Sequence, residues 1–116
     1  MKEKDGVHLD LGAGKIPRNP YQCKSLHAVD IYEPADLASH ITFAKANLSL
    51  QPIPYPDNTF DSISAFDFIE HIPRILAINQ DSTKLPFVDL MSEIWRVLKP
   101  NGMFYALTPA FPNGAA

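Results

Sequence analysis

The segment from His8 to Gly14 constrains the fold more than any other part of this sequence, because a short apolar stretch runs directly into a turn with two glycines. Val7 to Leu11 has the pattern of a buried parallel strand. The glycines that follow let the backbone pass close to a ligand, since they carry no Cβ. Asp30 ends a second strand-like segment, at the distance of about 20 residues at which nucleotide-binding α/β folds place a ribose-holding carboxylate. This pairing predicts a bound adenosine-type cofactor.

Each of these features has a plainer explanation when it is taken alone. A Gly-x-Gly turn also serves as a tight strand exit, and Lys15-Ile16-Pro17 stands where a dinucleotide fingerprint has its third glycine. Asp30 also fits a helix cap. Asp10 argues for a site, because a carboxylate inside an apolar strand is costly unless it holds backbone amides or a cationic group of a ligand. Together the glycine turn, Asp10 and Asp30 favour a cofactor site.

Size and composition exclude several classes of protein. The 116 residues predict one domain spanning residues 1–116. A net charge of −3 argues against a nucleic-acid binder. No apolar run approaches the roughly 20 residues that cross a bilayer, so we expect no membrane contact and a cytoplasmic location. Cys23 is the single cysteine, which excludes an internal disulfide framework and a multi-cysteine zinc site, and we expect no metal.

Strand-like and helix-like segments alternate along the chain, which predicts an α/β fold with a parallel sheet and right-handed crossovers. Lys15 to Ser25 contains Pro17 and Pro20, so we expect a loop or one short helical turn there. Gln51 to Asn58 carries three prolines and predicts an extended surface connection. The expected strands are residues 7–11, 26–31, 41–46, 60–66 and 103–108.

The clearest helix begins at Pro86, a residue that suits the first helical position, and ends before a turn at Lys99 to Gly102. Apolar side chains recur along it every three or four residues, which indicates one face in the core. Trp95 belongs to this set, so we expect it to be buried. Residues 69–79 predict a second helix, with Pro73 near its start. The apolar set is Phe87, Leu90, Met91, Ile94, Trp95 and Leu98.

Four segments follow one another in a recognisable order: Leu9–Gly14, Val29–Ile31, Pro54–Asp61 and Glu93–Gly102. In this order they resemble class I S-adenosylmethionine-dependent methyltransferases, and most of all the small-molecule methyltransferase domains that include enzymes of ubiquinone and menaquinone biosynthesis. The resemblance implies a Rossmann-like parallel sheet with strand order 3-2-1-4-5, flanked by helices. The family's complete fold adds a C-terminal antiparallel hairpin after the fifth strand, so we expect this chain to be either a fragment of a longer protein or a fold truncated after that strand.

The resemblance implies S-adenosylmethionine as the cofactor and assigns its contacts. The glycine turn would lie against the methionine portion and the ribose, with Asp10 toward the ammonium group. Asp30 would accept the ribose hydroxyls, and Ile31 would pack on the adenine. Asn47 stands where the family usually has an aspartate that meets the adenine amino group. The implied cofactor-binding residues are Asp10, Gly12, Ala13, Gly14, Asp30, Ile31, Asn47, Leu48 and Phe66.

Acidic and histidine side chains gather just after the fourth expected strand, where parallel folds place ligands. A methyl acceptor needs a base only if it must lose a proton, and a histidine has a near-neutral pKa. His71 is therefore the candidate base, with Asp67 beside it, although a packing role on a helix face fits His71 equally well. Glu70 fits a solvated first-turn residue.

The remaining histidines, His8, His27 and His40, show no ligand spacing and predict structural or surface roles. We expect Cys23 to be a free thiol in a loop. Three functions remain open: a methyltransferase acting on a small-molecule acceptor, a non-catalytic methyltransferase-like binding domain, and an NAD(P)-binding oxidoreductase domain. The missing third glycine disfavours the last. We also expect the strand at residues 103–108 to leave an open edge, through which the chain self-associates or is completed by another chain.

Overall fold

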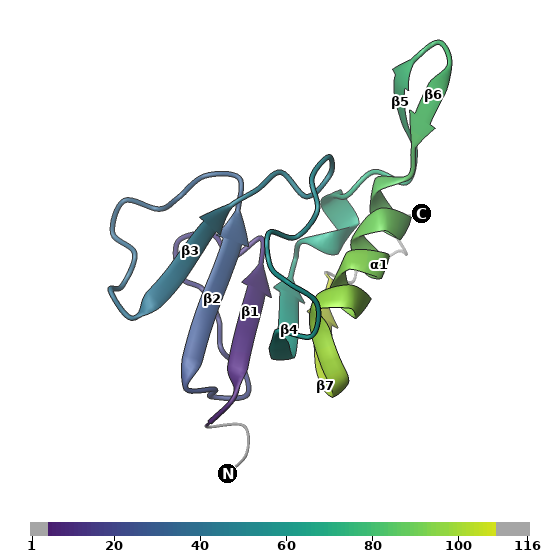
Figure 1. The fold of residues 1–116 in the computed structure, drawn as a ribbon. Helices are drawn as coiled ribbons and strands as arrows, with labels where there is room; N and C mark the ends of the chain where they lie inside the picture. Colours follow the sequence, from purple (N-terminus) through teal and green to yellow (C-terminus); the bar gives the residue numbers. More distant parts are fainter. Residues whose placement is uncertain (1–4, 109–116) are drawn as a thin grey trace, which may run out of the picture.

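A computed structural model describes residues 5–108. It shows a five-stranded parallel sheet with the order β3-β2-β1-β4-β7 (Figure 1). Since β7 is the fifth strand of this sheet along the chain, the predicted order 3-2-1-4-5 is confirmed. The strands are β1 (Val7–Leu11), β2 (Ser25–Asp30), β3 (Ile41–Lys45), β4 (Phe60–Phe66) and β7 (Leu98–Leu107).

The last strand of the sheet is longer than predicted. It begins at Leu98, directly after the helix, and includes the segment expected to be a turn. The strand is irregular in this segment. Its pairing with β4 shifts register between Phe60 and Ser62, and Asn101 has a φ of +67°. The Asn-Gly signal therefore marks a distortion inside the strand, because asparagine and glycine tolerate this left-handed conformation.

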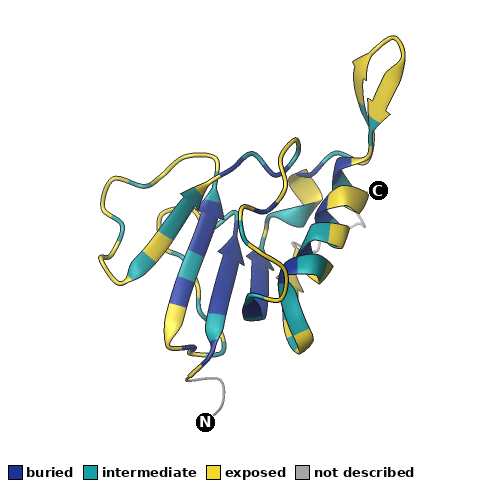
Figure 2. Cartoon of the chain, in the orientation of Figure 1, coloured by how far each residue is buried: buried dark blue, intermediate teal, exposed yellow. Residues whose placement is uncertain are grey.

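One face of the sheet carries the apolar core. Leu9 and Leu11 of β1 alternate with polar residues, and Ile63 of β4 lies beside Leu9 in the register, so these side chains share a face. The helix α1 (Pro86–Val97) packs on this face at its β4 and β7 side, and Figure 2 shows the buried strands β1, β2 and β4 beside it. The helix contributes Leu90, Ile94 and Val97 to the core.

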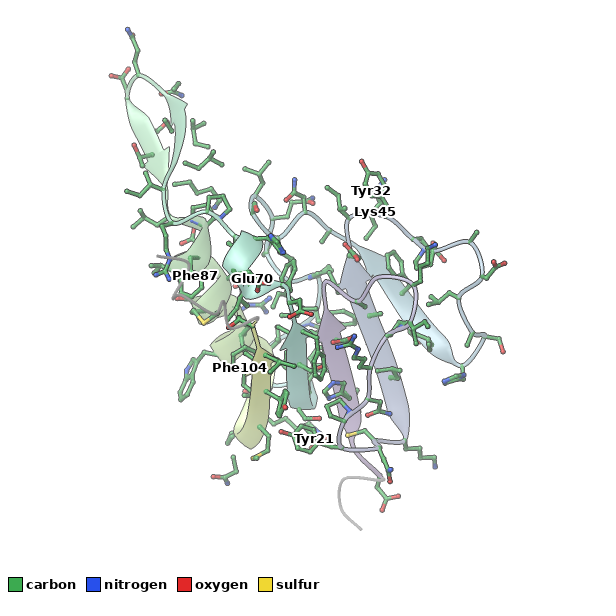
Figure 3. The ribbon with its side chains drawn as sticks, turned by 180° about the vertical axis from the view of Figure 1, so that it is seen from behind. Tyr21, Tyr32, Lys45, Glu70, Phe87 and Phe104 are labelled. Atoms are coloured by element: carbon green, nitrogen blue, oxygen red, sulfur yellow. The ribbon has the colours of Figure 1, made fainter. Side chains whose placement is uncertain are left out.

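The opposite face is covered by a loop. Residues 12–24 connect β1 to β2 without a helix, as Pro17 and Pro20 predicted, and we call this segment the β1–β2 loop. Its Tyr21 lies 6.1 Å from the His8 ring, measured between ring centroids, and Figure 3 views the sheet from this side. The expectation of flanking helices is thus not met in residues 5–108, where α1 is the one α-helix and it covers a single face.

The structure places Trp95 in solvent, so the prediction of a buried tryptophan is wrong. Its exposed fraction is 82%. The buried positions of α1 follow one another at Pro86, Leu90, Ile94 and Val97. Trp95 lies one residue after Ile94, which rotates it by about 100° around the helix. The apolar residues of the helix span a wide stripe that includes Trp95, but the sheet covers only the residues in the middle of that stripe.

The predicted second helix is also wrong. Residues Ile69–His71 form one 3₁₀ turn, and the chain then forms an antiparallel hairpin of β5 (Leu76–Asn79) and β6 (Ser82–Lys84), which extends away from the body (Figure 1). Ile72 ends the turn with an extended φ/ψ of −86°/122°. It precedes Pro73, and a residue before proline is disfavoured in the helical region.

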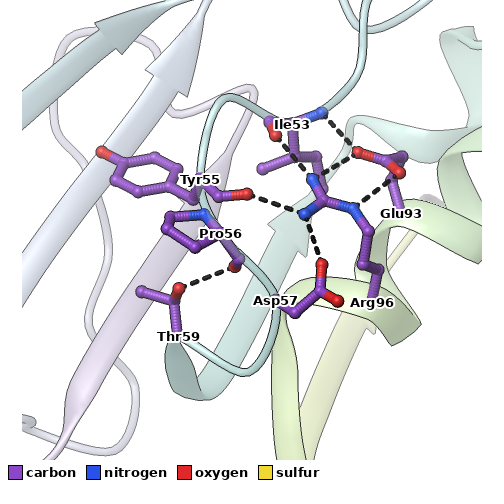
Figure 4. Close-up of polar contacts among 7 residues, drawn as sticks. All are labelled: Ile53, Tyr55, Pro56, Asp57, Thr59, Glu93 and Arg96. Carbon is purple, nitrogen blue, oxygen red and sulfur yellow. Dashed lines mark hydrogen bonds and ion pairs between the residues drawn. The ribbon is translucent and has the colours of Figure 1, made fainter.

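Arg96 holds the proline-rich connection before β4 against α1 (Figure 4). Its guanidinium donates 2.9 Å hydrogen bonds to the carbonyl oxygens of Ile53 and Tyr55. It also pairs with Glu93 at 2.7 Å and with Asp57 at 2.9 Å, and its hydrogen bonds to Glu93 lower the pKa of that carboxyl. The connection contains bends and turns, among them the 2.7 Å bond from the Tyr55 N–H to the Ile53 carbonyl, so the predicted extended form is not found. Most of it lies at the surface as predicted, but Ile53 is buried, with 1% exposed.

Candidate cofactor site

The two strand ends singled out by the sequence are hydrogen-bonded to each other. The Gly12 N–H donates to the Val29 carbonyl at 2.9 Å. The Gly14 N–H donates to Asp30 Oδ2 at 2.9 Å, and the Ile31 N–H donates to Oδ1 of the same carboxylate at 2.7 Å. Both strands end at the same edge of the sheet. The structure therefore brings the glycine turn and the Asp30 carboxylate into direct contact.

The two glycines of this turn are needed for different reasons. Both have a left-handed φ, +63° at Gly12 and +65° at Gly14. A Cβ at Gly12 would lie 2.2 Å from the ring of Phe68, whereas nothing lies within 4 Å of a Cβ at Gly14. Open space for a ligand therefore adjoins Gly14, and at Gly12 the Phe68 ring fills that space. Sequence reasoning missed Phe68.

Asp10 is almost fully buried, with 2% exposed. Its Oδ2 accepts a 2.8 Å hydrogen bond from the Arg18 N–H, and its Oδ1 accepts a 2.7 Å bond from the Ser64 hydroxyl. Burial raises the pKa of Asp10, and these two hydrogen bonds act in the opposite direction. Asp10 thus holds a backbone amide, one of the two roles that its place in an apolar strand predicted.

Ile31 and Asn47 follow the ends of β2 and β3, which are neighbours in the sheet. Ile31 is 40% exposed and available to a flat apolar ligand surface. Asn47 Oδ1 accepts a 3.1 Å bond from the Ser49 N–H, which leaves the oxygen a second lone pair. Leu48 packs in the core, so only its backbone is available at this edge.

The residues after β4 lie close to the β1–β2 loop. The guanidinium of Arg18 sits 4.6 Å from the centroid of the Phe66 ring, which in turn lies 5.4 Å from the ring of Tyr105. Asp67 is exposed, has a φ of +53°, and donates its N–H to the Leu107 carbonyl at 2.7 Å. Phe66 and Asp67 therefore lie at the carboxyl end of β4, as predicted.

The candidate base His71 lies at the end of the 3₁₀ turn. Its side chain is 73% exposed, and its Nε2 lies 3.5 Å from Oε2 of Glu70. It has no packing role on a helix face, because the predicted helix does not form. His71 is therefore accessible to a ligand or to solvent.

The other predicted structural residues fit their roles. His27 Nδ1 lies 2.9 Å from the Tyr55 hydroxyl, and its ring meets Phe60 edge-on. His40 is exposed. Cys23 is a free cysteine in the β1–β2 loop, and the loop buries it. His8 is fully buried in a polar network that the sequence analysis did not foresee.

Within residues 5–108, the structure has neither a metal-binding cluster nor a membrane-spanning helix. No group of three or more histidine, cysteine, aspartate or glutamate side chains is placed to hold a metal ion in this part of the chain. No helix within the same range is long and apolar enough to cross a membrane.

The strand order and the contact between a glycine turn and a carboxylate at neighbouring strand ends define the Rossmann-like class of α/β folds. A family model described as "Methyltransferase domain" matches residues 9–106. The chain therefore belongs to the class I S-adenosylmethionine-dependent methyltransferase domains, as its motifs predicted. Among proteins of curated function, none matches the sequence.

Several solved structures share the fold. A candidate S-adenosyl-L-methionine-dependent methyltransferase from Methanococcus maripaludis is 22% identical with a TM-score of 0.60, and 87% of this chain covers 47% of that protein. An S-adenosylmethionine-dependent methyltransferase from Mesorhizobium loti is 17% identical, with a TM-score of 0.64 and coverage of 90% and 47%. The YcgJ protein from Bacillus subtilis is 23% identical, with a TM-score of 0.60 and coverage of 87% and 43%. The chain spans less than half the length of each of these proteins.

Proposed function

We propose that this domain binds S-adenosylmethionine at the carboxyl ends of β1 and β2 and takes part in methyl transfer to a small-molecule acceptor. One observation carries the proposal: the 2.9 Å hydrogen bond from the Gly14 N–H to the Asp30 carboxylate. It sets a carboxylate beside the open space at Gly14. Membership of a methyltransferase family supports an adenosyl ligand in that space.

The nucleoside end of the cofactor is assigned to β2 and β3. Each oxygen of Asp30 accepts one N–H from the protein, so each retains lone pairs for one ribose hydroxyl. Ile31 would pack on the adenine, and the free lone pair of Asn47 Oδ1 would accept its amino group. The Leu48 backbone would complete this end.

The methionine end is assigned to β1 and β4. The backbone of the turn Gly12–Gly14, with Ala13 at its centre, would lie along the ribose and the methionine chain. The Asp10 carboxylate would face the ammonium group, and Phe66 would line the same end. The guanidinium of Arg18 stacks on the Phe66 ring and would hold it in this position.

Methyl transfer requires little of the protein except that it positions the methyl donor and the acceptor. When bound, S-adenosylmethionine would supply an activated sulfonium, whose methyl carbon would form a bond to the acceptor's lone pair as the carbon–sulfur bond breaks and leaves a neutral thioether. Asp67 and the exposed His71 are assigned to the acceptor side. His71 would take a proton from an acceptor that must lose one.

Calorimetry with three ligands tests the proposal. We expect S-adenosylmethionine and S-adenosylhomocysteine to bind and NAD to give no signal. Methyl transfer from labelled S-adenosylmethionine to a panel of small acceptors tests the catalytic part. Binding without transfer to any acceptor would favour a non-catalytic binding domain, and binding of NAD alone would favour an oxidoreductase domain.

We further propose that the open edge of β7 pairs with another strand, either from a second copy or from another chain. β7 is the edge strand of the sheet formed by residues 5–108, and it exposes Met103, Tyr105 and Leu107. Light scattering across a wide concentration range should show self-association. A clean monomer at every concentration would contradict pairing between copies.

A further inference from the structure

Four polar side chains form a buried group on the sheet face that the β1–β2 loop covers. Two alternate along β1 and two along β4, and the register sets His8 beside Ser62 and Asp10 beside Ser64. All four are between 0% and 3% exposed. We call them the polar ladder: His8, Asp10, Ser62 and Ser64.

Short hydrogen bonds connect the whole ladder. His8 Nε2 lies 2.7 Å from Ser64 Oγ, and Ser64 in turn donates to Asp10 Oδ1 at 2.7 Å. On the other side of the imidazole, His8 Nδ1 lies 2.6 Å from Ser62 Oγ. Cys23 Sγ lies 3.4 Å from the same hydroxyl. Within residues 5–108, no buried side-chain nitrogen or oxygen lacks a partner, so the ladder is fully satisfied.

The direction of these bonds follows from the number of hydrogens. Ser64 has one hydroxyl hydrogen and gives it to Asp10, so it must accept from His8 Nε2–H. Burial lowers the pKa of His8 to about 4, so the imidazole is neutral near pH 7 and Nδ1 carries no hydrogen. Nδ1 therefore accepts from Ser62. Every donor in the ladder points toward Asp10.

We propose that His8 is a positioning residue for the cofactor site, which acts through Ser64 to fix the Asp10 carboxylate that holds the β1–β2 loop. The inference rests on the proposed function for the identity of the ligand. It gives a role to a residue outside the implied cofactor contacts, because His8 is fully buried and touches no part of the site surface.

The link from Asp10 to the loop is a single bond. Asp10 Oδ2 accepts the Arg18 N–H at 2.8 Å, and the Arg18 side chain then stacks on Phe66. Without His8, the Ser64 oxygen loses its buried donor, and the hydroxyl turns away from Asp10 toward another partner. Oδ1 would then be a buried charged oxygen with no partner, and the carboxylate would rotate or take up a proton. Either change weakens the bond to the Arg18 N–H and loosens the loop that follows Gly14.

The test compares His8→Gln and His8→Leu. Glutamine can donate to Ser64 and accept from Ser62, as the neutral imidazole does, whereas leucine can do neither. His27→Leu is the matched control, because His27 lies on the other sheet face against Tyr55 and Phe60. Ser64→Ala provides a second variant in case His8→Leu fails to fold.

The first readout needs no ligand: hydrogen exchange of the Arg18 amide, followed by NMR. We expect exchange to accelerate about tenfold or more in His8→Leu and Ser64→Ala, and to stay near the wild-type rate in His8→Gln and His27→Leu. The nitrogen shifts of the wild-type His8 ring should show a neutral imidazole protonated at Nε2. Unchanged exchange in both His8→Leu and Ser64→Ala, or a His8 ring protonated at Nδ1, would overturn the proposal.

The second readout is the affinity for S-adenosylhomocysteine. We expect a loss of about tenfold in His8→Leu and recovery in His8→Gln, with wild-type affinity in His27→Leu. Equal losses in His8→Leu, His8→Gln and His27→Leu would show general destabilisation and overturn the positioning role. If the wild-type protein binds none of the cofactor, the proposed function fails, and Arg18 exchange still decides whether His8 positions the loop.

Discussion

The Gly14 N–H donates a 2.9 Å hydrogen bond to Oδ2 of Asp30, so the loop after β1 is tied to the end of β2. The same carboxylate binds the Ile31 N–H through Oδ1. A single side chain therefore shapes the turn and presents its remaining lone pairs beside it. Ligand affinity and loop geometry should both depend on this carboxylate.

Replacing Asp30 by alanine should reduce the affinity for S-adenosylhomocysteine by at least about tenfold, because each hydrogen bond to a charged group contributes about 1.5–3 kcal/mol. Calorimetry measures the loss. Asp36→Ala is the matched control, since Asp36 is an exposed aspartate in the segment between β2 and β3. Wild-type affinity in Asp30→Ala would show that the carboxylate is misassigned.

Alanine at Gly12 should destabilise the fold more than alanine at Gly14. Both substitutions force a Cβ into a left-handed conformation, at a cost of about 1–2 kcal/mol. At Gly12 the new Cβ also meets the Phe68 ring, which must move. Urea unfolding of each variant measures the difference.

A variant that combines Gly12→Ala with Phe68→Ala tests whether the Phe68 ring causes the additional loss of stability. Phe68→Ala should remove the extra cost of Gly12→Ala, so the two changes should be non-additive. Equal losses of stability for the two glycine variants, or strict additivity with Phe68→Ala, would contradict the contact.

Stability should fall as the pH drops from about 7 to 4, and His8 should carry part of this slope. The folded state holds His8 neutral down to a pKa of about 4, whereas the unfolded chain takes up the proton near the ordinary value of 6.5. The unfolded state therefore binds more protons between these pH values, and acid favours it. The full effect of His8 is of order 3 kcal/mol.

Urea unfolding of the wild-type protein and His8→Gln across this pH range isolates the effect. The pKa of His27 is also lowered by burial and that of Asp10 is raised, but both groups are present in the two proteins. The stability of the wild-type protein relative to His8→Gln should fall as the pH drops. Two parallel curves would show that His8 does not titrate differently in the folded state.

Loss of Arg96 should release the connection before β4. Arg96→Ala removes the donors to the Ile53 and Tyr55 carbonyls and takes the ion-pair partner from Glu93, which keeps only the Ile53 N–H, so we expect a loss of about 1–3 kcal/mol of unfolding free energy. Lys84→Ala is the comparison, because the side chain of Lys84 makes one ion pair, with Asp89 at 3.1 Å, and a single partly exposed pair should contribute under about 1 kcal/mol. Equal losses would mean that Arg96 acts as an ordinary surface ion pair.

The sheet could be predicted from the sequence because its strands carry local signals. Val7–Leu11 and Phe60–Phe66 match the predicted bounds, because each apolar segment is followed by a residue typical of turns, Gly12 or Asp67. Pro86 marked the first residue of α1. The hairpin at residues 76–84 was missed because Ile72-Pro73 breaks a helical pattern that continues on both sides of it. Trp95 was misplaced because the width of an apolar stripe does not show how much of it the sheet covers.

Part of the geometry of the candidate site was predictable: Gly12 and Gly14 take the left-handed φ that glycine tolerates, and Asp30 ends β2 beside them, as its spacing along the chain predicted. The supporting contacts of the site were not predictable. The contact of Phe68 with Gly12 and the hydrogen bond of Arg18 to Asp10 depend on how the chain folds, and no local sequence pattern predicts them. The polar ladder did leave a signal, because His-Leu-Asp-Leu and Ser-Ile-Ser-Ala show the same alternation of polar and apolar residues. Two such strands side by side indicate a sheet with one polar face.

A crystal structure of the protein soaked with S-adenosylhomocysteine tests the central claim most directly. The account predicts density for the nucleoside beside Gly14, with the ribose hydroxyls on the Asp30 carboxylate. An empty space between Gly14 and Asp30 at saturating ligand, or a ligand bound elsewhere on the domain, would contradict it.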